Sequence, residues 1–374
     1  MATAIHASLE WFEIIAKDEG NYDLAKLEAA INGKKEDFIQ DHLTNVIAET
    51  VGADFKEFLK RSSVFRIPVP ADAFNQLGDS ALLETGVNLT LHEQETLGRV
   101  DHFWVTPVIR QRQWDELDAV EKKRIHKIAY KWFADILDEL LNKKKLPEYN
   151  HLQEAVHHAL KCDNIRVACK YAIALGNYME KLLLYRDSLL LQQKVADRIT
   201  PDIEKEAIKE KDEYVAMLLN NLGESVSSFG DPAKAIEYYE KALAIDLAAY
   251  GDKHPEVATD YNNIGSAWRD LDDPAKAKEY YEKALAIDLA AYGNKHPEVA
   301  TDYNNIGSAW RDLDDPAKAK EYYEKALAIF LDAYGDNHPN VARDYNNIGA
   351  AWSDLGDPAK AKEYYEKALA IDLA

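Results

Sequence analysis

Three histidines in the middle of the chain carry side chains that can bind a transition metal. They are His151, His157 and His158. His157 and His158 are adjacent, however, and neighbouring residues on a helix point in different directions. No HExxH or CxxC motif accompanies them, although such motifs are the usual way in which a sequence groups zinc ligands. We therefore interpret these histidines as surface or packing residues and predict no metal site.

Two further polar sets recur along the C-terminal half, each just before a proline. The histidines are His254, His296 and His338, and the acid pairs are Asp272-Asp273 and Asp314-Asp315. A series of imidazoles can bind a ligand, and paired carboxylates can bind cations. An aspartate before proline is also a typical helix N-cap. Because the loop and capping roles need no bound ion, we favour them.

Other features argue against catalysis and against several classes of partner. The phosphate-binding sequence GxxxxGK[ST] does not occur, and no nucleophile, base and acid form a recognisable set. We predict that the chain is not an enzyme and needs no cofactor. The formal charge of -21, from 45 Lys plus Arg against 66 Asp plus Glu, disfavours binding to nucleic acid or to an anionic membrane.

The start of the chain and its cysteines indicate the cellular compartment of the protein. No apolar run approaches the roughly 20 residues that span a bilayer, and the first residues lack the features of a signal peptide. Cys162 and Cys169 suggest neither a disulfide framework nor a zinc cluster, and we expect both to be reduced. We predict a cytoplasmic protein.

An internal repeat positions most of these polar residues. The pair Asp-Pro recurs with a constant step of 42 residues, from 231 to 273 to 315 to 357, and the blocks between are nearly identical. Each unit predicts two helices, which both begin at a proline, and the second of which ends before a glycine. Their apolar faces can be covered only by neighbouring units. We therefore expect a mainly α protein with a right-handed α-solenoid.

The pattern inside each unit resembles the tetratricopeptide repeat. The matching residues in one unit are Tyr261, Ile264, Gly265, Trp268, Ala277, Tyr281 and Ala284. Small residues such as Gly265 let paired helices approach closely, and Trp268 fills the wedge between hairpins. The step of 42 exceeds the family's usual length of about 34 residues. This longer form, with NN before the small residue and HPEVA before the first helix, is similar to repeats of kinesin light chains and many bacterial sensor proteins.

The resemblance implies where a partner would bind. In tetratricopeptide arrays the first helix of each hairpin lines the concave face, and the residue two before the small position commonly hydrogen-bonds a peptide. Here these residues are Asn221, Asn263, Asn305 and Asn347, with Asn262 and Asn304 (and Asn220 and Asn346) beside them. Arg269 and Arg311, one turn further, can meet acidic groups of the partner. The alternative is that the asparagines bond to the backbone of the adjacent hairpin and only maintain the superhelical pitch.

The first part of the chain lacks the repeat. It predicts helices separated by turns, then a β-hairpin within VNLTLHEQETLGRVDHFWVTP and a helix that begins near Pro107. This order, and the segments SSVFRIPVPADAF, LLETGV and FWVTPVIRQ, resemble the winged helix that follows the nucleotide-binding core of STAND-type signalling ATPases. DNA binding by this part is disfavoured, because its expected recognition segment DSALLETGVN contains no Lys or Arg.

These patterns predict a winged-helix-like domain over residues 1–135, an irregular helical linker with degenerate repeats over 136–212, and a tetratricopeptide solenoid over 213–374. The expected function is a non-catalytic scaffold, or the sensor arm of a STAND-type ATPase, that binds a protein or peptide in the groove of its repeats. The alternative is a structural protein that associates with itself through its repeat ends.

Overall fold

The structure is a computed structural model that describes residues 51–89, 91–97, 100–143, 145 and 147–373. The helices expected before residue 51 lie outside these residues. The chain divides into two compact units, Met1–Asn164 and Ile165–Ala374. Each unit is considered by itself.

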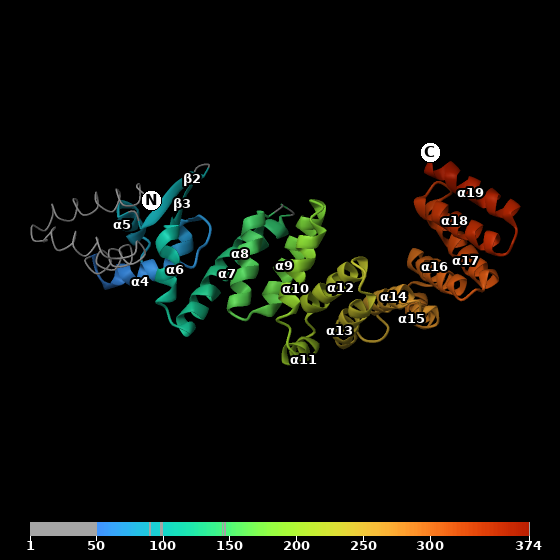
Figure 1. The fold of residues 1–374 in the computed structure, drawn as a ribbon, viewed down its shortest axis with the longest axis horizontal. Coiled ribbons are helices and arrows are strands. Elements are labelled where there is room, and N and C mark those ends of the chain that lie inside the picture. The colour runs from blue at the N-terminus through green and yellow to red at the C-terminus, as the bar shows by residue number, and fades with distance from the viewer. Residues whose placement is uncertain (1–50, 90, 98–99, 144, 146, 374) are drawn as a thin grey trace, which may run out of the picture. The chain divides into compact units, whose positions relative to one another are not determined.

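The first unit combines short helices with a small sheet (Figure 1). Its elements are α4 (Ala53–Ser62), β1 (Val69–Pro70), η1 (Ala71–Phe74), α5 (Leu82–Asn88), β2 (His92–Leu97), β3 (Val100–Val105), α6 (Pro107–Asp115), α7 (Ala119–Asn142) and α8 (Tyr149–Lys161). Strands β2 and β3 pair antiparallel, from His92 opposite Val105 to Leu97 opposite Val100, and β1 lies on the other side of β3. The predicted hairpin and the helix beginning at Pro107 are therefore confirmed.

Helices α7 and α8 complete the first unit and pack against each other. The domain boundary expected after residue 135 falls inside α7, which continues to Asn142. The side chain of Arg66, in the turn after α4, forms an ion pair of 2.6 Å with Glu154 of α8. Because Glu154 is only 3% exposed, this contact fixes α8 against the β-containing part of the unit.

The second unit is a series of helices in which successive hairpins pack on each other (Figure 1). The irregular part contains α9 (Ile165–Lys181), α10 (Tyr185–Ala196) and α11 (Pro201–Glu210). Four hairpins follow: α12 (Glu213–Ser228) with α13 (Pro232–Tyr250), α14 (Pro255–Asp270) with α15 (Pro274–Tyr292), α16 (Pro297–Asp312) with α17 (Pro316–Tyr334), and α18 (Pro339–Asp354) with α19 (Pro358–Asp372). The two-helix interpretation of each repeat is confirmed.

The glycine of each repeat allows the closest helix contact. A Cβ added at Gly265 or Gly307 would lie 2.7 Å from a ring carbon of Tyr281 or Tyr323, which is too near for two carbon atoms. The degenerate hairpin of α9 and α10 keeps the same arrangement, because a Cβ at Gly176 would lie 2.8 Å from the amide nitrogen of Gln192. The irregular helices before residue 213 thus include a hairpin packed like those of the repeats.

Polar residues before each proline cap the helices. Asp273 accepts a hydrogen bond from the backbone N–H of Lys276 at 3.1 Å, and His296 Nδ1 accepts one from Glu298 at 3.2 Å. The ring of His296 also stacks on Tyr292, with 4.2 Å between ring centroids. The loop and capping interpretation of these repeated residues is therefore confirmed. Within the described ranges, none of the helices combines the length and the apolar character needed to cross a membrane.

Candidate functional site

The first helices of the four hairpins, α12, α14, α16 and α18, each carry two adjacent asparagines. We call Asn220, Asn262, Asn304 and Asn346 the first set, and Asn221, Asn263, Asn305 and Asn347 the second set. Adjacent residues on a helix are rotated by about 100° from each other. The two sets therefore face different surroundings, and the structure gives them different partners.

The first set holds neighbouring hairpins together. The side-chain nitrogens of Asn220, Asn262 and Asn304 donate hydrogen bonds of 2.7, 2.6 and 2.7 Å to an aspartate on the first helix of the next hairpin. These acceptors are Asp260, Asp302 and Asp344, and all three are 0% exposed. A buried carboxylate without a donor would be costly. The amide nitrogens of Asn262 and Asn304 are therefore engaged inside the array.

The second set is half-buried and mostly free of internal partners. Asn305 donates a hydrogen bond of 3.3 Å to Asn262 Oδ1. Among the described residues, the side chains of Asn221, Asn263 and Asn347 have no hydrogen-bond partner. An amide both donates and accepts, so each of these three side chains can still bond to a ligand.

Arg269 and Arg311 lie on the same helices and also link successive hairpins. Their Nε atoms donate to Asp312 at 2.7 Å and to Asp354 at 2.6 Å. The two arginine side chains remain 43% and 44% exposed. An acidic group of a partner would have to share each guanidinium with the aspartate already bound to it.

Pairs of buried aspartates lie at two of the hairpin interfaces. The carboxyl group of Asp260 interacts with that of Asp246 of α13, and the carboxyl group of Asp302 interacts in the same way with that of Asp288 of α15. Burial, assisted by the paired acid, raises the pKa of Asp260 and of Asp302 to about 8. Each pair therefore retains a proton near neutral pH.

At the third hairpin interface, between α17 and α18, other residues occupy the place of the aspartate pair. Phe330 occupies the position of Asp246 and Asp288, and Arg343 Nε lies 3.8 Å from Asp344 Oδ1. Burial raises the pKa of Asp344 to about 7. The sequence analysis missed these aspartates, although a signal was present: Asp260 lies three residues after Val257 and four before Ile264, in the phase of the buried stripe.

A cavity of about 490 Å³ lies beside the second set at the start of the array. Asn221 and Glu224 of α12 line it together with Asn177 of α9. At its edge are two aromatic side chains, Tyr185 and Phe229, which are 53% and 56% exposed. The cavity therefore combines an amide of the second set with polar groups and exposed aromatic surface.

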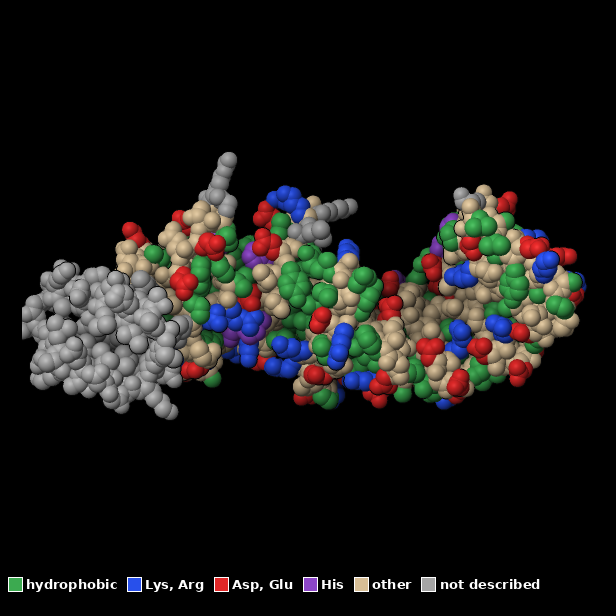
Figure 2. Space-filling model, turned by 45° about the horizontal axis from the view of Figure 1, so that its top comes forward, with side chains coloured by type: hydrophobic (Ala, Val, Ile, Leu, Met, Phe, Trp, Pro, Cys, Tyr) green, Lys and Arg blue, Asp and Glu red, His purple; other side chains and the backbone are tan. Residues whose placement is uncertain are grey.

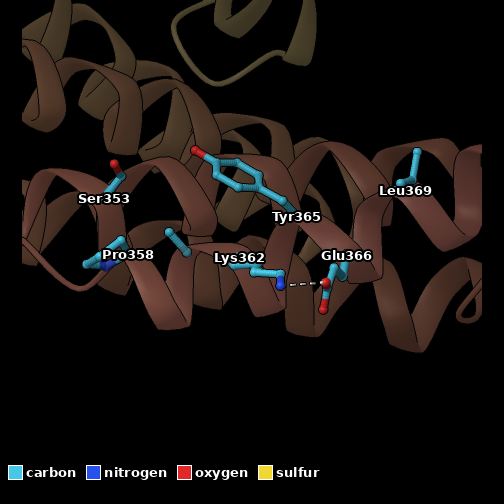
Figure 3. A pocket seen from close by; sticks show the side chains of 7 residues that line it. Ser353, Pro358, Lys362, Tyr365, Glu366 and Leu369 are labelled. Carbon is cyan, nitrogen blue, oxygen red and sulfur yellow. Dashed lines mark ion pairs between the residues drawn. The ribbon is translucent and has the colours of Figure 1, made fainter.

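A second cavity, of about 350 Å³, lies on the hairpin of α18 and α19 (Figure 3). Tyr365 and Leu369 line it and are 41% and 55% exposed. An ion pair of 3.6 Å between Lys362 and Glu366 borders it. The equivalent Tyr323 is only 2% exposed, because the next hairpin covers it.

The histidines of the first unit are arranged differently from the prediction. The nearest nitrogen atoms of His157 and His158 converge with one of His126, and the three atoms lie within 4.8 Å of one another. The expectation that His157 and His158 diverge is therefore wrong. Helical side chains are long enough for two adjacent rings to turn toward a common point on the packed helix. The sequence analysis did not single out His126, which lies on α7 rather than α8.

Comparison with known protein families finds a match over the repeats. The tetratricopeptide repeat model matches residues 214–290, 269–332 and 298–374. No curated protein matches the chain. Among solved structures, BtubC (BKLC) from P. vanneervenii is 21% identical, with a TM-score of 0.47 over 69% of this chain and 92% of that one.

Two further structures are similar to parts of the chain. A predicted kinesin light chain from Podosopora anserina with nearly identical TPR-like repeats is 18% identical, with a TM-score of 0.46 over 54% of this chain and 94% of that one. The MamA protein is 22% identical, with a TM-score of 0.37 over 55% of this chain and 91% of that one. Taken with the hairpin geometry, the family match identifies residues 214–374 as tetratricopeptide repeats.

Proposed function

We propose that the repeats bind an extended segment of another polypeptide along the face formed by the second set of asparagines. The observation that carries this proposal is the division between the two sets. Three members of the first set bond to buried aspartates of the next hairpin, whereas Asn221, Asn263 and Asn347 have no internal partner among the described residues. Half-buried amides without partners are suited to bind the alternating N–H and C=O groups of an extended backbone.

The surroundings of the second set favour a basic or neutral partner. The chain carries a formal charge of -21, and Figure 2 shows acidic and basic side chains interspersed over the repeats. The guanidinium groups of Arg269 and Arg311 are already paired with aspartates. The cavity at Asn221, with Tyr185 and Phe229 at its edge, has room for one apolar side chain of the bound segment.

The test uses a peptide selected against the intact protein from a display library of random sequences. The double variant Asn221→Ala plus Asn263→Ala removes two amides that have no internal partner, so we expect weaker peptide binding at an unchanged melting temperature. Calorimetric titration measures peptide binding, and circular dichroism measures the melting temperature.

The matched control removes the neighbouring residue of each pair. The variant Asn220→Ala plus Asn262→Ala deprives Asp260 and Asp302 of their donors, so we expect a lower melting temperature. If the second-set variant is the one that melts early and still binds the peptide normally, the assignment of the binding face is wrong.

We further infer that this binding serves signalling, with the repeats as the sensing arm of a STAND-type ATPase in the cytoplasm. The support is the resemblance of the N-terminal segments to a winged helix, together with the order of short helices, hairpin and helix in the first unit. The encoding gene provides the test. A GxxxxGK[ST] sequence upstream of this chain is expected, and a gene that encodes no such sequence would contradict the inference.

A second candidate function is association of copies through the hairpin of α18 and α19. The exposed Tyr365 and Leu369 on this hairpin favour it (Figure 3), since Tyr323, the counterpart of Tyr365, is covered by the next hairpin. Light scattering over a concentration series should show association that Leu369→Glu weakens. The control Ala370→Glu changes a neighbouring exposed residue that does not line the cavity. A strict monomer at all concentrations would rule this function out.

A further inference from the structure

Three imidazole rings meet between α7 and α8 of the first unit. His126 Nδ1 and His158 Nδ1 are 2.9 Å apart, and a nitrogen of His157 completes a group whose atoms lie within 4.8 Å of one another. The ring centroids of the three residues are separated by 5.1 to 5.7 Å. Three nitrogen atoms therefore point toward one small volume.

The three rings are held in place by their neighbours. Trp114 contacts the ring of His126 edge-on with 4.9 Å between centroids, and Phe133 stacks on His158 at 5.8 Å. His126 and His158 are 7% and 0% exposed. His157 is half-buried, so it leaves a route to the group from the surface. Figure 2 shows histidine side chains beside Lys and Arg on the visible face of this unit.

A carboxylate lies behind the group, on the side away from the three nitrogens. Glu154 Oε2 is 3.4 Å from His158 Nε2, and Arg66 fixes the same carboxylate through three hydrogen bonds of 2.6 to 3.2 Å. The ion pair with Arg66 favours the charged form of this carboxylate. A charged carboxylate beside Nε2 favours the tautomer of His158 in which Nδ1 is free to accept a metal.

These observations match the needs of a transition-metal site. Imidazole nitrogen suits Zn²⁺, Cu²⁺ and Ni²⁺, and a carboxylate hydrogen-bonded to the far side of a ligating histidine is a common second partner. Tetrahedral Zn²⁺ with bonds of about 2.0–2.1 Å places its ligands about 3.3 Å apart. On binding, the two nitrogen atoms that are 2.9 Å apart would have to separate slightly, and the more widely spaced nitrogen atoms would have to approach each other.

We propose that His126, His157 and His158 bind one first-row transition-metal ion, of which Zn²⁺ fits best, with Glu154 orienting His158. Three protein ligands leave the fourth tetrahedral position for water or for a group from a partner. Glu154 balances the charge of Arg66 beside the group.

The full chain without an affinity tag, stripped with a chelator, is titrated with Zn²⁺ by calorimetry and with Co²⁺ by visible absorption. We expect one ion per chain and a Co²⁺ spectrum typical of tetrahedral coordination. His157→Gln, which changes the half-buried ligand, should weaken binding at least about tenfold, and Glu154→Gln should weaken it about 10- to 100-fold.

The matched control is His151→Gln on the same helix. His151 is also half-buried, but it lies against Phe133 and Glu148 rather than in the group of three. This variant should bind the ion as the unchanged protein does.

X-ray absorption of the Zn²⁺-loaded protein gives a readout that requires no variant, and it should show three imidazole ligands. The proposal is overturned if the stripped chain takes up neither ion, if X-ray absorption finds no imidazole shell, or if His151→Gln weakens binding as much as His157→Gln. In each of those cases the three rings only pack the two helices together.

Discussion

The repeats should lose stability as the pH rises from about 6 to about 8. In the folded chain, burial raises the pKa of Asp260 and of Asp302 from 3.8 to about 8. The folded state therefore keeps a proton that the unfolded state has released. A group with a raised folded pKa stabilises the fold fully below its unfolded pKa, and this contribution disappears as the pH passes the folded pKa.

The size of the effect follows from proton linkage. Between the unfolded and the folded pKa, each pH unit lowers the free energy of unfolding by about 1.4 kcal/mol per retained proton. This slope becomes smaller near the folded pKa. The loss between about pH 6 and about pH 8 is then about 2 kcal/mol for each aspartate pair, or about 4 kcal/mol for both. Asp344, with a pKa of about 7, adds about 1 kcal/mol.

Urea unfolding followed by circular dichroism at the two pH values measures this loss. Asp302→Asn keeps an oxygen to accept from Asn262 but removes the carboxyl group that retains the proton, so the variant should lose about 2 kcal/mol less stability between the two pH values. Asp312→Asn, at a carboxylate that is 42% exposed, is the control, and its loss of stability between the two pH values should equal that of the unchanged protein. If Asp302→Asn loses as much stability as the unchanged protein, the buried pair does not retain the proton.

Three further outcomes are expected. Gly307→Ala should destabilise the array by about 1–3 kcal/mol, because the new Cβ would lie 2.7 Å from the ring of Tyr323; thermal melting measures this, and a neutral result would mean that the helices separate easily. His296→Ala should cost about 1 kcal/mol in the same assay, because it removes the N-cap of α16; an unchanged melting temperature would show that the cap contributes nothing. Limited trypsin digestion should cut first at the exposed Lys143 and Lys145, between α7 and α8, and early cleavage inside the repeats would contradict this.

The hairpins and their caps could be predicted from the sequence because they depend on local rules. Proline at the first helical turn, aspartate or histidine before it and glycine at the end of the second helix each act within a few residues, and most of the repeat helices share them. The β-hairpin before Pro107 was predictable for the same reason, since alternating residues on either side of a short turn determine it.

The contacts between hairpins were harder to predict. Asn262 and Asp302 are 40 residues apart and meet only after two helices have packed, so no local pattern connects them. The sequence analysis left open whether the asparagines bond to a ligand or to the next hairpin. In the structure, Asn220, Asn262 and Asn304 do bond to the next hairpin, but to aspartate side chains rather than to its backbone. His126 was missed for a similar reason, because 31 residues and a helix boundary separate it from His157.

The separation of roles within each asparagine pair has a consequence for binding. If a partner had to break the bond from Asn262 to Asp302, it would leave a buried carboxyl group without its donor, and that penalty would offset much of the binding free energy. The second set imposes no such cost at Asn221, Asn263 and Asn347, since their amides have only to exchange water for the ligand. Binding and hairpin stability should therefore respond to different residues, one position apart on the same helix.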